Sequence, residues 1–244
     1  MRYAVFSDVH ANLEALDAVL ADAALRSPDA YVCLGDIVGY GPDPNECVAR
    51  VQRLGAAAIA GNHDRGVVGL FDMSAFSPLA RAAIEWTAGE LTDEHRAFLA
   101  ALPERLESPT FLGVHGSPRD PVEEYILTLP QALAIFAESP FRVCLVGHTH
   151  IPGLFVRDGD GHIRAQDFTP ESPVELVATS RYIVNGGSVG QPRDGDPRAA
   201  YLIYDDGGRS VTLHRVAYAV AATQAKMRAR GLPPLLSSRL AAGM

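Results

Sequence analysis

The stretch Tyr3-Ala4-Val5-Phe6-Ser7-Asp8-Val9-His10 decides the fold, because a short apolar run leads directly into two side chains that bind metals. Residues 3–6 have the length and composition of a buried strand. Asp8 and His10 follow where that strand gives way to a loop. Active sites of open α/β sheets are built at the carboxyl ends of strands. We therefore expect an α/β fold whose functional site begins at Asp8.

Four further polar blocks repeat this arrangement, each behind an apolar run, at residues 31–34, 56–60, 110–114 and 141–146. The blocks are Gly35-Asp36, Gly61-Asn62-His63-Asp64, Val114-His115-Gly116 and Gly147-His148-Thr149-His150. The steps from Asp8 to Asp36, Asp36 to Asn62 and His115 to His148 are 28, 26 and 33 positions. One βαβ unit takes about 30 residues. The spacing predicts three such units, which bring the blocks to one edge of a sheet.

The remaining step, from Asn62 to His115, is 53 positions and contains extra helical sequence. Helices are expected at 78–88 behind the cap Ser77 and at 93–101 behind the cap Thr92. We interpret 65–105 as a helical insertion beside the site, a candidate lid or wall. Two earlier helices are expected at 13–24, with Asn12 as cap, and at 44–54.

The second half of the chain is rich in strand patterns. Asp158-Gly159-Asp160-Gly161 indicates a hairpin, and further strands are expected at 174–177, 181–184, 200–204 and 210–216. This favours a second sheet packed on the first. Residues 217–244 are expected to form a helical tail. No repeat or linker divides the chain, so we expect one domain over 1–244.

Composition restricts the class of protein. The hydrophobic share of 48% and charged share of 20% over 244 residues are ordinary for a soluble globular chain. The net charge of −8 disfavours binding to a nucleic-acid duplex. Three scattered cysteines do not form a disulfide framework, and no apolar run reaches the ~20 residues of a membrane span. Without a recognisable leader at position 1, a cytoplasmic protein without a membrane partner is expected.

The side chains of the blocks indicate the chemistry. Aspartate and histidine together suit Mn, Fe, Zn, Ni or Co better than Ca. Two such ions about 3.5–4 Å apart can hold both the attacking and the departing oxygen of a phosphoryl displacement. Asp36 is the natural bridge between two ions. The residues alone leave open which of His148 and His150 joins Asp8 and His10 at one ion, and which joins Asn62 and His115 at the other.

In this order the blocks resemble those of the calcineurin-like metallophosphoesterases, in particular the small bacterial and archaeal phosphodiesterases. The resemblance covers residues 1–191. It implies a four-layer α-β-β-α sandwich of two mixed sheets flanked by helices. It also implies that Asp8, His10, Asp36 and His150 hold one metal ion and that Asp36, Asn62, His115 and His148 hold the other. His63 matches the catalytic histidine of the family, and Asp64 matches its partner.

The expected reaction is hydrolysis of a small phosphodiester or nucleotide. A water held between two dications loses a proton near neutral pH and becomes the nucleophile. Histidine is the side chain best suited to protonate the departing oxygen at pH 7, and His63 directly follows the ligand Asn62. We expect Asp64 to hold the other ring nitrogen of His63.

Three residues are candidate substrate contacts, each with a structural alternative. Arg193 ends a Gly-rich loop that starts at Asn185 and could grip a phosphate, or the loop could be a tight turn. Gly186 stands there where the family usually has proline. Tyr40 could stack on a base or simply pack in its loop. Arg119, just past His115, could contact substrate or form a surface ion pair.

Other functions remain open at this stage. A symmetric dinucleoside polyphosphate hydrolase would use Tyr40 and the Arg193 loop. A protein phosphatase would need a peptide groove, for which 244 residues leave little room. A non-catalytic metal-binding scaffold of the same fold is the alternative from another class, but such proteins tend to lose the ligands or the histidine that are present here. The sequence leaves the native metal, the substrate, the choice between mono- and diester and the oligomeric state undetermined.

Overall fold

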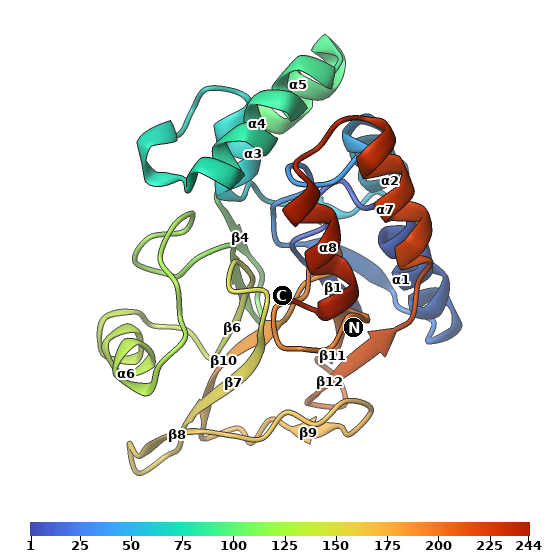
Figure 1. The fold of residues 1–244 in the computed structure, drawn as a ribbon. Helices are drawn as coiled ribbons and strands as arrows, with labels where there is room; N and C mark the ends of the chain where they lie inside the picture. Colours follow the sequence, from blue (N-terminus) through green and yellow to red (C-terminus); the bar gives the residue numbers. More distant parts are fainter.

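The computed structural model describes residues 1–244 and contains two six-stranded sheets (Figure 1). In spatial order the first sheet contains β3 (Ala57–Ala58), β2 (Ala30–Cys33), β1 (Arg2–Phe6), β11 (Ala199–Asp205), β12 (Ser210–Val216) and β9 (Val174–Glu175). The second contains β4 (Arg105–Glu107), β5 (Leu112–Val114), β6 (Val143–Val146), β10 (Arg181–Gly186), β7 (Pro152–Arg157) and β8 (Ile163–Ala165).

Both sheets are mixed, and their parallel parts position the polar blocks. Strands β1, β2 and β3 run parallel, whereas β11 pairs antiparallel with β1. In the second sheet β5, β6 and β10 run parallel, and β7 pairs antiparallel with β10. The carboxyl ends of parallel strands share one edge. The polar blocks that follow β1, β2, β3, β5 and β6 are therefore delivered to two facing sheet edges.

Eight helices complete the fold, together with a short 3₁₀ turn at Met73–Ala75. They are α1 (Leu13–Leu25), α2 (Pro44–Leu54), α3 (Asn62–Val67), α4 (Pro78–Glu90), α5 (Asp93–Ala101), α6 (Leu129–Glu138), α7 (Val220–Ala229) and α8 (Pro234–Ala242). Figure 1 shows α1, α2, α7 and α8 on one side of the sheets and α6 on the other. None of these helices combines the length and apolarity needed to cross a bilayer.

Alternation of side chains along the strands creates the layers. In β1, Ala4 and Phe6 join the core cluster under the helices, while Val5 joins the cluster between the sheets. In β6, Leu145 enters the cluster between the sheets and Cys144 packs in the cluster beneath α6. Because successive strand residues point to opposite faces, each sheet is covered on both sides. The predicted α-β-β-α sandwich of two mixed sheets is confirmed.

Helix starts follow the predicted caps. The side chains of Asn12, Ser77 and Thr92 accept hydrogen bonds from the backbone N–H groups of Ala15, Ala80 and His95, respectively. Such caps satisfy donors that a helix start leaves free. Helices α2 and α5 have the predicted bounds, 44–54 and 93–101.

The division of strands between the sheets differs from the expectation. The later strands do not form a sheet of their own, because β11, β12 and β9 extend the first sheet from β1. Strands β5 and β6, from the first half, lie in the second sheet beside β10. Helices α3 and α6 were also not predicted individually. Hydrophobic patterns locate strands, but pairing between distant strands depends on tertiary packing that local patterns do not contain.

Candidate metal centre

The polar blocks converge on a single buried site between the two sheets. Each of the seven predicted ligands is at most 8% exposed. They come from the loops after β1, β2, β5 and β6 and from the first residue of α3. The ligands are Asp8, His10, Asp36, Asn62, His115, His148 and His150.

The backbone at this site is strained. Asp8, His10, Asp36, His148 and His150 all have positive φ, between 47° and 67°. The left-handed region costs a non-glycine residue about 1–3 kcal/mol. Strain of this kind persists only where the surrounding structure holds it, and it clusters at functional sites. Packing of the surrounding structure thus offsets the cost of the strained backbone that directs these five side chains into the site.

Asp8, His10 and His150 form the first group. Nε2 of His10 lies 3.1 Å from Nε2 of His150, and Nε2 of His150 lies 3.3 Å from Oδ1 of Asp8. The ligand atoms of all three residues lie within 4.8 Å of one another. Two ring nitrogens and a carboxylate oxygen therefore face a common point, an arrangement that could hold a metal ion.

Asp36, His115 and His148 form the second group. Nε2 of His115 lies 3.2 Å from Nδ1 of His148 and 3.4 Å from Oδ2 of Asp36. The same Oδ2 atom of Asp36 lies 3.5 Å from Nε2 of His10 in the first group. Asp36 therefore stands between the two groups, as a bridging carboxylate must.

The oxygen donors of the site fit metal ions. Oδ1 of Asp8, Oδ2 of Asp36 and Oδ1 of Asn62 are buried and have no hydrogen-bond partner. A buried polar atom without a partner is costly. The second oxygen of each carboxylate is satisfied, since Asp8 accepts from the backbone N–H of His148 and Asp36 from that of His63. The unpartnered oxygens of Asp8 and Asp36 are those that face the ring nitrogens of the site.

The imidazoles are fixed through the ring nitrogen that points away from the site. Nδ1 of His10, His115 and His150 lies 3.2, 2.8 and 2.6 Å from the backbone carbonyls of Val38, Leu34 and Gln191, respectively. His148 is reversed, with Nε2 at 2.9 Å from the Glu123 carbonyl and Nδ1 turned inward. In a neutral imidazole, donation to a carbonyl leaves the inward nitrogen unprotonated and available as a ligand.

The buried site contains carboxylates whose negative charge most of its histidines do not balance. Burial lowers the pKa of His10 and His150 and brings the pKa of His148 to about 3, so these rings are neutral. Burial disfavours the charged form of His115 as well, but the Asp36 carboxylate outweighs it and raises the pKa of His115 to about 9. Burial also raises the pKa of Asp8. Bound cations would offset this cost of burying carboxylates.

His63 lies beside the first group. Its ring centre is 4.8 Å from that of His10, 4.4 Å from that of Tyr40 and 5.2 Å from that of Phe76. Burial lowers the pKa of His63 to about 4, against the opposing charge of Asp36. Nδ1 of His63 is buried without a partner.

The expected hydrogen bond between Asp64 and His63 is absent, and that prediction was wrong. The Asp64 carboxylate instead accepts from the backbone N–H groups of Gly61, at 3.0 Å, and Val38, at 3.2 Å. Consecutive helical residues do not face the same way, so the side chain of Asp64 turns back over the start of α3. Asp64 therefore holds the loops around His63, without a hydrogen bond to its ring.

The three candidate substrate contacts differ in position. The Tyr40 ring packs against His10 at 4.7 Å. The guanidinium of Arg193 lies 5.7 Å from the centre of the Tyr40 ring. Both are therefore at the site. Arg119 points elsewhere: its guanidinium pairs with Glu124 and, at 3.4 Å, with Glu138. That geometry matches the surface ion pair and not the substrate contact.

One aromatic neighbour of the site carried no signal in the sequence. The Tyr125 ring stacks on His148, with ring centres 3.9 Å apart, and is 41% exposed. It belongs to the loop between β5 and α6, which has no recognisable motif. Its contact could be found only from the path of that loop across the second sheet.

Fold and site together define a metal-binding α/β protein with its centre between two sheets. A family model described as the calcineurin-like phosphoesterase superfamily domain matches residues 1–207, and the chain belongs to that superfamily. The superfamily depends on two metal ions, and the groups around Asp36 are those that could bind them.

The chain is also similar to individual proteins over its full length. An uncharacterised protein of Methanocaldococcus jannaschii is 37% identical over 98% of this chain and 97% of its own. The crystal structure of a metallophosphoesterase from Sphaerobacter thermophilus is 44% identical, with a TM-score of 0.90 over 100% of this chain and 99% of that one. A hypothetical protein of Pyrococcus horikoshii, 21% identical, has the same fold, with a TM-score of 0.82 over 100% and 98% of the two chains.

Proposed function

We propose that this chain is a phosphoesterase that hydrolyses a small phosphodiester or nucleotide with two divalent transition-metal ions. One observation carries the proposal. Two buried oxygens without partners, on Asp8 and Asp36, converge with inward-facing nitrogens of four histidines. A set of mixed oxygen and nitrogen donors is the kind that Mn, Fe, Zn, Ni or Co accepts. Manganese is the ion we expect.

The geometry supports a division of the ligands between two ions. Asp8, His10 and His150 would hold one ion, and Asn62, His115 and His148 the other, with Asp36 shared. When bound, the ions would supply an activated water and neutralise charge on the phosphoryl group. Placing His150 with His10, and His148 with His115, follows from the close approach of their ring nitrogens.

His63 is the proposed general acid. It is the one histidine of the five blocks without a close nitrogen–nitrogen approach to another histidine, and its ring lies at the edge of the first group, with a nitrogen within 4.8 Å of ligand atoms of His10 and Asp36. Burial alone favours its neutral form. An anionic phosphate beside the ring would oppose that effect and favour the imidazolium. The proton would then pass from His63 to the departing oxygen.

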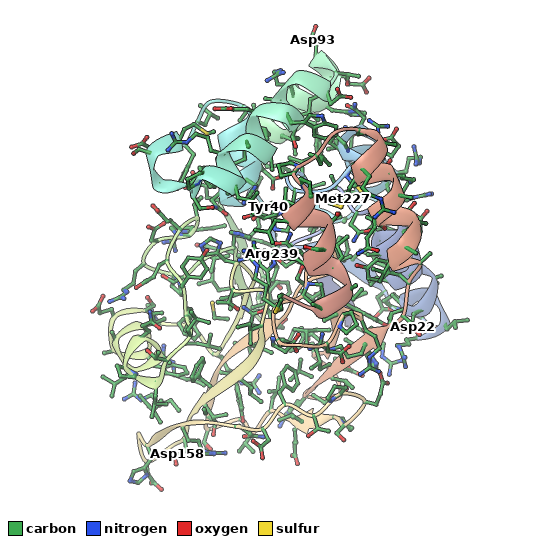
Figure 2. All side chains as sticks on the ribbon, viewed as in Figure 1. Asp22, Tyr40, Asp93, Asp158, Met227 and Arg239 are labelled. Carbon is green, nitrogen blue, oxygen red and sulfur yellow. The ribbon has the colours of Figure 1, made fainter.

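The proposal is tested with the purified chain and bis(p-nitrophenyl) phosphate. Added Mn should give turnover, and a chelator should abolish it. Asp36→Ala should remove activity, whereas Asp93→Ala is the matched control. Asp93 is an exposed acidic residue at the start of α5, far from Tyr40 in Figure 2. A chain that binds metal but cleaves no phosphoester with any divalent ion would instead be a scaffold.

A further inference from the structure

One of the four ligand histidines is held from the surface of the molecule. The outer ring nitrogens of the other three approach backbone carbonyls of residues that are at most 1% exposed. These residues are Val38 for His10, Leu34 for His115 and Gln191 for His150. His148 differs, because its Nε2 lies 2.9 Å from the carbonyl of Glu123, which is an exposed residue. The orientation of His148 therefore depends on the loop between β5 and α6 and not on the core.

The same loop also covers the ring of His148. The Tyr125 ring stacks on it, with ring centres 3.9 Å apart and ring planes 22° apart. Tyr125 is 41% exposed, whereas His148 is only 3% exposed, so the tyrosine lies on the outer side of this ligand. The next residue, Ile126, is buried and fixes the end of the loop in the core. A hydrogen bond at one edge and a ring on one face thus hold the imidazole of His148.

The loop starts directly after His115, the other histidine ligand of the second group. The backbone N–H of Ser117 donates to the carbonyl of Asp120 at 2.8 Å, which closes a tight turn. A Cβ at Gly116 would lie 2.7 Å from that same carbonyl oxygen, closer than real Cβ atoms come. The chain thus passes from His115 to the contacts with His148 through a compact turn that needs glycine.

Arg119 connects the turn with the residues that contact His148. Its guanidinium pairs with the Glu124 carboxylate, with Nε at 3.1 Å, and the hydroxyl of Ser117 donates to the same carboxylate. Ser117 is fully buried, and Glu124 lies in the chain between the two residues that contact the imidazole. The arginine that the sequence marked as a candidate substrate contact therefore acts on the loop around His148.

Partners that orient a metal-binding imidazole typically change metal affinity about 10–100-fold. A surface loop opens at a lower free energy than the core does. Resting on the division of ligands between two ions given above, we propose that residues 116–125 set the affinity for the ion held by His115 and His148. Tyr125 and Arg119 are positioning residues for His148. The ion of the second group is then the one that is lost when this loop is disturbed, while the ion of the first group stays.

The test measures binding of Mn to the metal-free full chain by calorimetry, without substrate. The wild type should bind two ions. Tyr125→Ala should weaken the binding of one ion about 10–100-fold and leave the other unchanged. Tyr125→Phe should keep both affinities, because its ring still stacks on His148. Arg119→Ala should weaken the same ion by a smaller factor, about two- to fivefold, since its ion pair is partly exposed.

Two variants on other surfaces are the matched controls, and both should leave the two affinities unchanged. Leu133→Ala removes an exposed apolar side chain from α6. Arg50→Ala breaks an exposed pair with Asp17, at 2.9 Å, between α1 and α2. Figure 1 shows those two helices on the side of the molecule away from α6.

A mutant cycle identifies the ion that is affected. In a His148→Ala background, Tyr125→Ala should have no further effect, whereas in a His150→Ala background it should keep its full effect. Equal weakening of both ions by Tyr125→Ala, or an effect that persists in His148→Ala, would overturn the inference, as would a wild type that binds fewer than two ions. If two ions bind as described but bis(p-nitrophenyl) phosphate is not hydrolysed, only the proposed function fails.

Discussion

Oδ2 of Asp36 lies 3.4 Å from Nε2 of His115, and each group changes the pKa of the other. The carboxylate raises the pKa of His115 to about 9. Although burial acts in the opposite direction, the charge of His115 holds the pKa of Asp36 well below its usual range. Asp36 is therefore the anion around which the site is organised.

Removing that charge should empty the site of metal. Asp36→Asn keeps the size of the side chain but replaces an anionic ligand by a neutral amide. We expect metal content to fall from about two ions per chain to below one, and activity to fall by at least about 100-fold. Elemental analysis of dialysed protein measures the first, and Asp93→Asn on the exposed start of α5 is the control. Two retained ions in Asp36→Asn would contradict the bridging role.

Gly61 has a steric reason to be glycine. A Cβ at Gly61 would collide with the carboxylate and the backbone nitrogen of Asp36. Gly61→Ala should therefore lower the free energy of unfolding by about 1–3 kcal/mol. Gly89 in α4 is the matched comparison, because a Cβ there meets open space. Gly89→Ala should stabilise by about 0.5–1 kcal/mol. Urea unfolding measures both, and effects of the same sign would contradict this account.

Much of the site could be predicted because its ligands directly follow short apolar strand patterns in the sequence. Strand ends place Asp8, Asp36 and His115 near one another, and the spacing of about one βαβ unit carries that information along the chain. The contacts of Asp64 were not predictable in this way. Its bond to the N–H of Gly61 is a local contact at the start of α3, but its bond to the N–H of Val38 depends on how two loops approach each other.

The same limit applies to the flanks of the centre. Tyr125 reaches it from a loop that carries no motif, and only the packed fold brings the ring there. The pairing of β11 with β1 is of the same kind, because its register joins residues about 200 positions apart.

The free energy of unfolding should depend on pH through the carboxyl group of Asp22. Its carboxylate accepts from the Tyr201 hydroxyl at 2.7 Å and from Nε of Arg26 at 3.0 Å. Burial raises the pKa of Asp22, but these hydrogen bonds outweigh it and hold the pKa below the ordinary 3.8. A carboxylate whose pKa is lower in the folded than in the unfolded chain contributes fully to stability at any pH above its unfolded-state pKa. It loses that contribution as the pH falls through its folded-state pKa.

Asp22→Asn should therefore cost stability at pH 7 and progressively less below pH 3.8. Urea unfolding of wild type and variant from pH 7 to pH 3 measures the difference. Tyr201→Phe, which removes one donor, should reduce the acid dependence in part. A difference between wild type and Asp22→Asn that stays constant over this range would show that the carboxylate charge contributes nothing.

Asp64 should act on stability and not on proton transfer. Asp64→Ala leaves the N–H groups of Gly61 and Val38 without an acceptor, and each unsatisfied buried donor costs about 1–3 kcal/mol. We expect a lower free energy of unfolding in urea. The ratio of rates for good and poor leaving groups should stay near the wild-type value. A variant of wild-type stability with a changed ratio would restore Asp64 as a partner of His63.

His63, unlike Asp64, should affect how the rate depends on the leaving group. If it protonates the departing oxygen, His63→Ala should slow esters with alkyl leaving groups by about 10²–10⁴-fold. Hydrolysis of p-nitrophenyl esters should fall far less, because nitrophenolate departs without a proton. His63 also forms a group with His10 and Asp36, but the groups Asp8, His10, His150 and Asp36, His115, His148 are complete without it, so metal content should stay at the wild-type level. Equal losses for both classes of ester, with metal retained, would show that His63 orients the substrate instead of donating a proton.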